Sequence, residues 1–511
     1  MTESFNVYSV PAEEVPATDY ALSVNCRPVF THPARVSAYP VNVYCPPFQR
    51  PLAQTEIASF ASWDMGGPVE VEVKSRRPVQ SVTVRPLSAG VSPRIDGDSI
   101  RFAIARPSQY TVEVNDSHQA LHLFANPPEE AAPDPKGPDV LYFGPGVHCA
   151  GLIRMQSGQT LYVAAGAIVH GAVVAEHAQN ITICGRGILD GSTFARESLA
   201  SLILLYHCEN VRIEDIVLRD SGVFTLTPVA SREVHIRHVK VIGNWRYNSD
   251  GIDFLNCRSC TLEDSFIRTF DDSLCVKGWR NFGAFIYRMY IVEGCGPMDR
   301  RFVVDGVEGT LDELQERFGD YPCPQDTCRD IQVRRCVIWC DWGRPLEIGA
   351  KTQVDEIRDL LFEDCDLIHS PGCCAVMSVQ NSDRALCRDL LYRNIRVELD
   401  DQPSRPVIVR SPDEPYEKPY DGYLPTLIRL SNQVGYVSSD CDRGRIEDIR
   451  FENIAPAMPP SQLRGFDEEH PVQRVTVANL SLNGRLVTDL ENAGMQMNEF
   501  VRDVALRDGG E

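Results

Sequence analysis

Residues 248–272, which read NSDGIDFLNCRSCTLEDSFIRTFDD, hold four aspartates in two tight pairs. Asp250 and Asp253 form the first pair, and Asp271 and Asp272 form the second. Carboxylates that share a site repel one another, and the pKa of at least one of them rises. Such a pair can cleave a glycosidic bond, because one member protonates the leaving oxygen while another activates water. This chemistry requires a fold that brings the two pairs together.

A loose repeat after residue 140 indicates such a fold. Each unit has two polar residues, a short strand, two more polar residues and a second strand, as in AQNITICGRGILDG from Ala178. Units that follow one another directly are spaced by a few tens of residues, which is typical of a parallel β-helix. The last apolar residue of each first strand marks the units: Ile183, Ile213, Ile236, Leu262, Val333, Phe362, Tyr392 and Phe451.

Two steps between these markers are much longer than the others, namely Leu262 to Val333 and Tyr392 to Phe451. We interpret them as missed coils plus insertions, with residues 297–326 and 404–425 as the segments that build the walls of a cleft. A β-sandwich array is the alternative that the spacing leaves open.

In a β-helix, residues one period apart lie nearly above each other, about 4.8 Å apart per rung. We therefore expect Asp250 and Asp271 on adjacent coils and on the same face, with Asp272 pointing elsewhere beside them, so that three carboxylates share one patch. Asp253 is a candidate for substrate binding, with a second interpretation as a turn residue, because Asp favours corners between strands.

The first third of the chain has a different pattern. Segments such as PVEVEVKSR and YTVEVND alternate apolar and polar residues between Pro, Gly, Asn and Asp, which predicts an antiparallel β-sandwich. The Pro-rich and acidic residues 126–139 read as a linker. We expect an all-β protein with a sandwich domain at residues 1–135 and a right-handed parallel β-helix at 136–511.

The motif NSDGID, followed by DD, resembles the signature of glycoside hydrolase family 28, the polygalacturonase-like enzymes. It is also similar to family 49, which contains dextranases and isopullulanases. Residues 142–191 resemble the entrance coils of these proteins, and the likeness covers about residues 140–400. The resemblance implies that Asp271 is the general acid and that Asp250 and Asp272 deprotonate the attacking water. It further implies that Asn248 anchors the first loop and that the anomeric carbon is inverted.

The chain departs from polygalacturonases at two motifs. WGRPLEIGAKT stands where those enzymes have Gly-His-Gly, so that Arg344 lies at the histidine position with Glu347 nearby. CCAVMSVQN, residues 373–381, replaces an Arg-Ile-Lys motif that clamps the substrate carboxylate. We therefore expect a neutral saccharide rather than a polymer of uronic acid.

Other residues near the acids are candidates for substrate binding. Indole and phenol rings stack on the apolar faces of sugars, with core packing as the alternative. Lysine and arginine are candidate cleft cations, with salt bridges to nearby acids as the alternative. The candidates of these two kinds are Trp245, Tyr247, Trp279, Trp342, Lys277 and Arg344.

The bulk composition limits the partners. The net charge of −21 repels phosphate backbones and anionic membranes, so we expect neither nucleic acid nor a membrane as partner. We see no signal peptide, and we interpret the 18 scattered cysteines as reduced packing residues of a cytoplasmic protein that needs no metal or other cofactor. A homo-oligomer is left open.

Two alternatives to a hydrolase remain at this stage. One is a polysaccharide lyase whose acidic cluster binds calcium, with Lys277 or Arg344 as the base. The other is a β-helix that binds carbohydrate without cleaving it.

Overall fold

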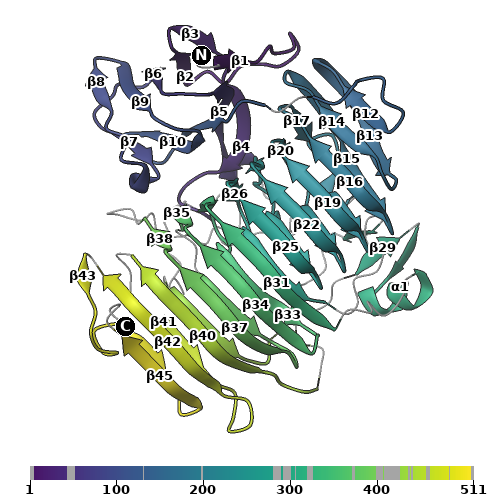
Figure 1. Ribbon diagram of the computed structural model, residues 1–511, viewed down its shortest axis with the longest axis vertical. Coiled ribbons are helices and arrows are strands. Elements are labelled where there is room, and N and C mark those ends of the chain that lie inside the picture. Colours follow the sequence, from purple (N-terminus) through teal and green to yellow (C-terminus); the bar gives the residue numbers. More distant parts are fainter. Residues whose placement is uncertain are drawn as a thin grey trace.

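The computed structural model shows a β-sandwich beside a long parallel β-helix (Figure 1). No helix within the described part of the chain is both long and apolar enough to cross a membrane. The structure describes residues 5–42, 52–129, 132–196, 199–279, 289–291, 301–304, 306–318, 326–370, 375–398, 407, 426–435, 438, 441–455, 461–482 and 484–507.

The sandwich consists of two sheets that enclose an apolar core around Trp63, Val73 and Val112. The first sheet is antiparallel throughout, whereas the second contains one parallel pair, β5 with β11, which differs from the fully antiparallel sandwich expected. The first sheet has the order β3 (Arg27–Val29), β2 (Tyr20–Val24), β6 (Val69–Ser75), β9 (Ser99–Ile104) and β8 (Arg94–Asp96). The second has the order β1 (Phe5–Val7), β5 (Thr55–Met65), β11 (Leu121–Asn126), β10 (Ser108–Val114) and β7 (Val82–Arg85), with β4 (His32–Ser37) also on β5.

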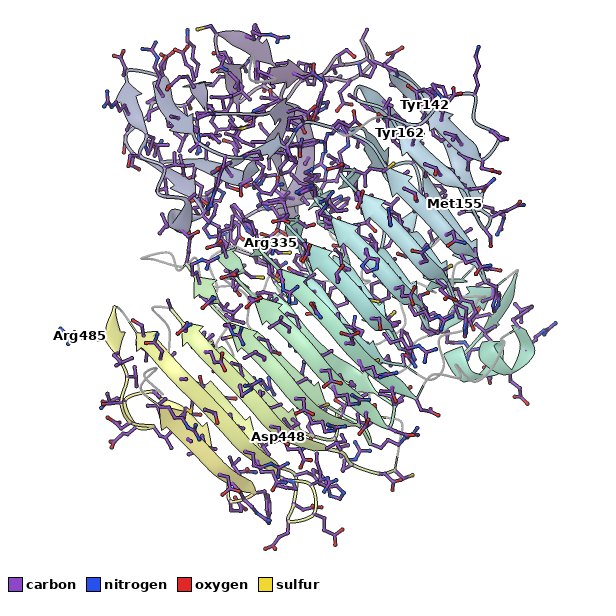
Figure 2. All side chains as sticks on the ribbon, viewed as in Figure 1. Tyr142, Met155, Tyr162, Arg335, Asp448 and Arg485 are labelled. Atoms are coloured by element: carbon purple, nitrogen blue, oxygen red, sulfur yellow. The ribbon has the colours of Figure 1, made fainter. Side chains whose placement is uncertain are left out.

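One long face of the β-helix is a sheet of 13 strands within the described ranges. Charged side chains such as Asp448 lie on its outward face (Figure 2). Its strands, in order, are β12 (Val140–Phe143), β14 (Thr160–Val163), β16 (Gln179–Cys184), β19 (Glu209–Glu214), β22 (Arg232–Arg237), β25 (Arg258–Glu263), β31 (Thr327–Arg334), β34 (Glu356–Glu363), β37 (Leu386–Arg393), β40 (Arg445–Ile454), β42 (Val472–Leu482) and β43 (Arg485–Leu486), with β45 (Val501–Arg507) also on β42.

The other sheet of the helix has 18 described strands in two columns, so that each coil crosses it twice. One column contains β17 (Ile188–Asp190), β20 (Val217–Arg219), β23 (Lys240–Ile242), β26 (Phe266–Thr269), β32 (Val337–Cys340), β35 (Asp366–His369) and β38 (Arg396–Val397). The other contains β18 (Ser201–Tyr206), β21 (Phe224–Val229), β24 (Ile252–Leu255), β27 (Leu274–Gly278), β33 (Leu346–Thr352), β36 (Ala375–Asn381), β39 (Thr426–Asn432), β41 (Ser461–Arg464) and β44 (Met495–Met497). The long strands β13 (Gly146–Met155) and β15 (Ala167–Glu176) begin the sheet.

The marker residues of the repeat pair directly from rung to rung. Ile183 lies opposite Ile213, and Leu262 lies opposite Val333. Tyr392 likewise lies opposite Phe451. The two long steps between markers are therefore single coils with insertions, and the expectation that coils were missed there is wrong. The expected fold class, a right-handed parallel β-helix preceded by a sandwich, is confirmed.

The interior of the helix is a continuous apolar stack. Inward-facing Val, Ile and Leu of successive coils pack against one another, and the rings of Phe362, Tyr392 and Phe451 stack with centroid distances of 4.8 and 4.9 Å. Several buried cysteines, among them Cys257 and Cys260, belong to this stack as free thiols. Cysteine thus serves here as a small apolar residue, as the sequence indicated.

The insertion after β27 carries its own elements. β28 (Met289–Ile291), β29 (Phe302–Val304) and β30 (Val307–Gly309) form a small antiparallel sheet, and α1 (Leu311–Phe318) follows it. Val304 and Leu314 pack on Leu204 and Leu255 of the helix column that contains the acidic motifs. Of the second expected wall, residues 404–425, only Val407 lies within the described residues, where it bridges to Asn42.

The sandwich is attached to the outward face of the β26 and β32 column. Phe124 of the sandwich packs on Phe266, and the His122 ring lies edge-on to Trp339. The guanidinium of Arg268 lies 3.7 Å from the centre of the Trp339 ring, and both side chains are fully buried. This attachment fixes the coil from which the acidic motifs emerge.

Candidate active site

The register between β24 and β27 brings the two aspartate pairs together. Ile252 lies opposite Leu274, so this coil is one residue longer than the separation of Asp250 from Asp271. The Gly251 N–H donates to the Asp272 carbonyl over 2.9 Å. Asp250 therefore lies beside Asp272, and the expectation that it lies above Asp271, with Asp272 pointing elsewhere, is wrong by one residue. All three carboxylates still belong to one site, because the charge of Asp272 raises the pKa of both Asp250 and Asp271.

Two glycines allow the coils to approach so closely. A Cβ on Gly251 would lie 2.3 Å from the Ser273 carbonyl oxygen, and one on Gly343 would lie 2.3 Å from the Asp272 nitrogen. Both are backbone atoms, so any larger residue would push the rungs apart. These glycines explain the Asp-Gly and Trp-Gly pairs of the motifs.

Asn248 connects the first motif to Asp271. Its φ of 57° lies in the left-handed region, which Asn tolerates better than most residues. Its N–H donates to Asp271 Oδ2 over 3.2 Å. Arg196 donates to the Tyr247 carbonyl oxygen over 2.9 Å and to Asn248 Oδ1 over 3.4 Å. Asn248 therefore anchors the loop and orients Asp271 through its backbone.

Asp250 and Asp253 share one cation. The Lys277 ammonium lies 2.9 Å from Asp250 Oδ2 and 2.6 Å from Asp253 Oδ1. Both carboxylates are buried, and desolvation raises their pKa values, whereas Lys277 opposes the rise. The carboxylates in turn raise the pKa of Lys277 well above its usual value, despite its burial. Lys277 is thus a fixed ammonium inside the acid cluster, and Asp253 is a buried ion-pair partner rather than a turn residue or a substrate contact.

Asp271 has the electrostatic surroundings of a general acid. Desolvation, followed by the adjacent Asp272 carboxylate, raises the pKa of Asp271 to about 6. The Asp272 carboxylate accepts from the Arg344 N–H over 2.8 Å and lies 3.5 Å from the Arg344 guanidinium. The two neighbouring carboxylates therefore have different partners, as an acid and a base that work together require.

Glu347 extends the cluster onto the next rung. It lies opposite Cys275 of β27 and is fully buried. Gln380 donates to its Oε1 over 2.9 Å, and the Arg344 guanidinium lies 3.5 Å from its Oε2. Desolvation raises the pKa of Glu347 to about 7. Arg344 thus lies between Asp272 and Glu347, which confirms that it pairs with nearby acids.

The described carboxylates of the cluster do not suit a metal ion. Among the described residues, Asp250, Asp253 and Cys275 have ligand atoms within 4.8 Å of one another. The Lys277 ammonium already lies between these two carboxylates, and a thiol is a poor ligand for calcium. The residues present therefore do not fit the calcium site of a lyase.

The aromatic candidates separate into two groups. Trp245 is only 4 % exposed, donates from its Nε1 to Asp220 over 3.1 Å and has the Arg246 guanidinium over its ring. It is not placed where a sugar could stack on it. Tyr247, Trp279 and Trp342 are half-buried. Of these, Trp279 is partly covered by the Lys351 ammonium, 4.6 Å from its ring centre.

The backbone of Trp342 lies next to the acid cluster. The backbone N–H of Trp342 donates to the carbonyl oxygen of Phe270 over 2.8 Å, and Phe270 directly precedes Asp271. Gly343 follows it and lies against the backbone of the Asp271–Asp272 pair. The half-buried indole of Trp342 is therefore attached to the backbone at the edge of the acid cluster.

Sequence reasoning missed the residues that support the acids from other coils. Gln380 binds Glu347, and Arg196 holds the loop of Asn248. Asn244 and Thr225 hold the Asp250 carbonyl over 3.3 and 2.8 Å. Gln380 lies within residues 373–381 on the rung next to Glu347, opposite Gly349, and only the periodicity pointed toward the other positions.

The segment that contains this site is similar to a known protein family. Residues 162–296 match the model of glycosyl hydrolases family 28. The expected resemblance to this family is confirmed. The matched segment contains both aspartate pairs and Lys277.

A curated relative and two solved structures are similar to the chain. A probable polygalacturonase of Vitis vinifera is 32 % identical over 84 residues, which are 16 % of this chain and 17 % of that protein, so the chain spans only a small part of that relative. Dex49A from Penicillium minioluteum has a TM-score of 0.51 at 12 % identity and covers 98 % of this chain and 96 % of its own. An exopolygalacturonase from Thermotoga maritima has a TM-score of 0.40 at 14 % identity and covers 73 % and 84 %. The likeness to Dex49A covers the sandwich as well as the helix and confirms the fold.

Proposed function

We propose that this protein is an inverting glycoside hydrolase that cleaves a neutral, α-linked oligo- or polysaccharide. The observation that carries the proposal is the group of three aspartates on adjacent rungs, of which Asp271 has a pKa raised to about 6. The match to the glycosyl hydrolase family 28 model over the segment that contains these aspartates supports it.

In the proposed mechanism, the protonated Asp271 carboxyl donates its proton to the glycosidic oxygen as the bond to the anomeric carbon breaks. Asp250 and Asp272 hold a water molecule and accept its proton while its oxygen attacks the anomeric carbon from the opposite face. The products are an alcohol on the leaving sugar and a hemiacetal of inverted configuration. Asn248 keeps Asp271 oriented, and Lys277 stabilises the ionised form of Asp250.

Charge around the cluster supports a neutral substrate. A uronate would need a cation to bind its carboxylate, and Arg344 and Lys277 are each already paired with two acids. Strand β36 presents Ser378 and Gln380 next to Glu347 instead of basic residues. The net charge of −21 also disfavours polyanions.

The decisive experiment is the Asp271→Asn variant. We expect kcat to fall by roughly 10²- to 10⁴-fold, which is the usual contribution of a general acid, with the melting temperature unchanged. Release of reducing ends from neutral α-linked di- and trisaccharides measures the activity, and NMR of fresh product follows the anomer. An inverting enzyme yields the β-anomer first.

The matched control is Asp448→Asn, which makes the same chemical change at a partly exposed ion pair on the outward face of the helix. It should retain full activity. An Asp271→Asn variant that hydrolyses as fast as this control would reject the proposed acid. Faster cleavage of trigalacturonate than of neutral sugars would reject the proposed substrate class, and an unsaturated product would indicate a lyase.

A further inference from the structure

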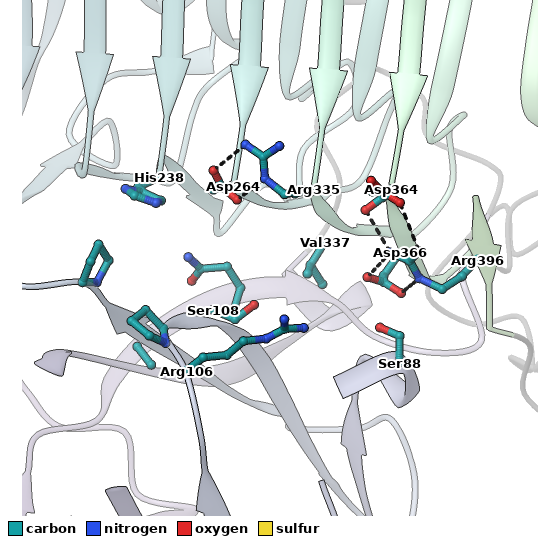
Figure 3. A pocket seen from close by; sticks show the side chains of 14 residues that line it. Ser88, Arg106, Ser108, His238, Asp264, Arg335, Val337, Asp364, Asp366 and Arg396 are labelled. Atoms are coloured by element: carbon teal, nitrogen blue, oxygen red, sulfur yellow. Dashed lines mark hydrogen bonds and ion pairs between the residues drawn. The ribbon is translucent and has the colours of Figure 1, made fainter. Parts of the chain in front are cut away.

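A cavity of about 470 Å³ lies between the sandwich and the edge of the β-helix, away from the acid cluster (Figure 3). This volume is in the range of small-molecule sites. Its helix side is formed by the turns before β26, β32 and β35, which carry Asp264, Arg335 and Asp364. Its sandwich side includes Arg106 and Gln109. The walls are therefore polar and come from both domains.

On the β-helix side of the cavity, the wall is lined by arginine–aspartate ion pairs. Arg335 binds Asp264 through two hydrogen bonds of 2.8 and 2.9 Å. Arg396 binds Asp366 through two more, and its Nη1 lies 3.8 Å from Asp364. Each guanidinium on this wall faces a carboxylate, so the wall has both donors and acceptors but little net charge.

The sandwich wall provides a buried acceptor and an exposed donor. Gln109 is only 4 % exposed, and within the described part of the chain its Oε1 atom is buried without a hydrogen-bond partner. A buried carbonyl oxygen of this kind is costly unless a donor reaches it. Arg106 is exposed and reaches from the sandwich toward the ion pairs of the helix (Figure 3). Among the described residues, the cavity thus offers no donor to the Gln109 oxygen and no acceptor to the Arg106 guanidinium.

A hydroxyl group meets both needs, because it donates and accepts at once. Sulfate has no proton for the Gln109 oxygen, and any inorganic anion would also face three aspartates. A cation would face three arginines. We propose that this cavity is a second, non-catalytic binding site for a neutral saccharide, seated between the sandwich and the helix.

The proposed site is separate from the acid cluster. Strand β26 lies between Asp264 and Asp271, and β32 lies between Arg335 and Arg344. Four residues of extended strand span about 13 Å, so one sugar ring cannot contact both places. A saccharide in the cavity would hold the substrate chain to the enzyme or tie the two domains together, without entering the reaction.

Binding is measured by isothermal titration calorimetry on full-length Asp271→Asn protein, which does not consume the probe. The probes are isomaltotriose and maltotriose, with trigalacturonate and sulfate as anions. We expect one of the neutral probes to bind, and its affinity to fall roughly tenfold in Gln109→Leu, which keeps the side-chain volume, and in Arg106→Ala. Lys74→Ala, an exposed change elsewhere on the sandwich, should have no effect.

Hydrolysis separates this proposal from the proposed function. Gln109→Leu and Arg106→Ala in the otherwise wild-type chain should cleave a soluble trisaccharide at the normal rate. If Gln109→Leu fails to fold, the exposed Arg106→Ala variant still gives the answer. Neutral sugars that bind equally well to all variants, tighter binding of the anions, or a crystal soaked with the probes that contains only water in the cavity would each overturn the proposal.

Discussion

The ammonium group of Lys277 lies between two carboxylates that would otherwise repel each other. It cannot reach solvent freely, and its two partners hold it by hydrogen bonds of 2.9 and 2.6 Å. An opposite charge at this distance favours the ionised form of a carboxylate. Lys277 is therefore a positioning residue that keeps Asp250 available to accept a proton from water.

Removing this charge should change the pH profile of kcat/KM. Asp250 must be ionised, so activity is lost as the pH falls through its pKa, which burial already raises well above the usual value. Asp271 must be protonated, so activity is lost as the pH rises through about 6. In Lys277→Met the pKa of Asp250 rises, and the acidic limb should move upward by about one pH unit or more. The fraction of enzyme in which Asp250 is ionised and Asp271 is protonated then falls, and the maximal rate falls with it.

The comparison variant is Lys74→Met, which removes the same charge from the exposed surface of the sandwich and should leave both limbs in place. If Lys277→Met lowers kcat/KM by the same factor at every pH, with neither limb of the profile displaced, then Lys277 has a purely structural role.

The sequence predicted which acidic residues lie close together, but not which neighbouring groups each of them contacts. The repeat spacing brought Asp250 near Asp271 and Asp272, whereas the register within the coil depends on turns that Gly251 and Gly343 make tight. Trp245 was a candidate for sugar binding, with core packing as the alternative, because indole suits both. Its hydrogen bond to Asp220 comes from the preceding coil and has no signal in the motif itself, although the Arg246 guanidinium over its ring belongs to the next residue of the chain.

The strands of the helix derive their stability from stacking on neighbouring rungs. Phe362, Tyr392 and Phe451 are nearly parallel, with interplanar angles of 9° and 12°, and all three are buried. The Tyr392 hydroxyl is buried without a hydrogen-bond partner among the described residues. The ring therefore stabilises the stack while its oxygen does not.

Two substitutions at Tyr392 should have opposite effects on stability. Tyr392→Ala leaves a cavity in the stack and should lower the free energy of unfolding by about 3–5 kcal/mol. Tyr392→Phe removes only the unpaired oxygen and should be neutral or stabilising by about 1 kcal/mol. Urea unfolding followed by circular dichroism measures both. A large loss in Tyr392→Phe would show that the hydroxyl has a partner.

The strands were the part of the fold that the sequence predicted best. Every marker residue from Ile183 to Phe451 lies in a rung of the 13-stranded sheet, because inward-facing residues must be apolar and must recur once per coil. The lengths of the two insertions misled the count of coils. A loop leaves the sheet without changing the pairing of its ends, so sequence distance alone cannot show how many rungs it replaces.

The whole molecule is held together by contacts between segments far apart in the chain. The Tyr39 hydroxyl donates to Asp341 Oδ1 over 2.6 Å and accepts from Trp339 Nε1 over 2.9 Å. Asp341 and Trp339 are fully buried. The sandwich segment thus reaches the coil that continues to Trp342 and Arg344 of the site. A contact across 302 residues has no local pattern, so the sequence predicted the two domains but not how they dock.

Tyr39→Phe should therefore destabilise the docked molecule. It removes the donor to a buried carboxylate, and we expect the free energy of unfolding to fall by about 1–3 kcal/mol. The control is Tyr142→Phe, where the ring stacks on Tyr162 at 5.4 Å in the first coils (Figure 2). Equal melting temperatures for the two variants would contradict a role for Tyr39 in docking.

The direct pairing of Leu262 with Val333 has an evolutionary consequence. The chain can leave the solenoid after Trp279 and return at Asp326 by a path of any length, while the rung pairing on either side stays intact. Related enzymes can then diverge in what they recognise by exchanging this segment, and a protein engineer can graft a new one, without disturbing the groups that handle protons.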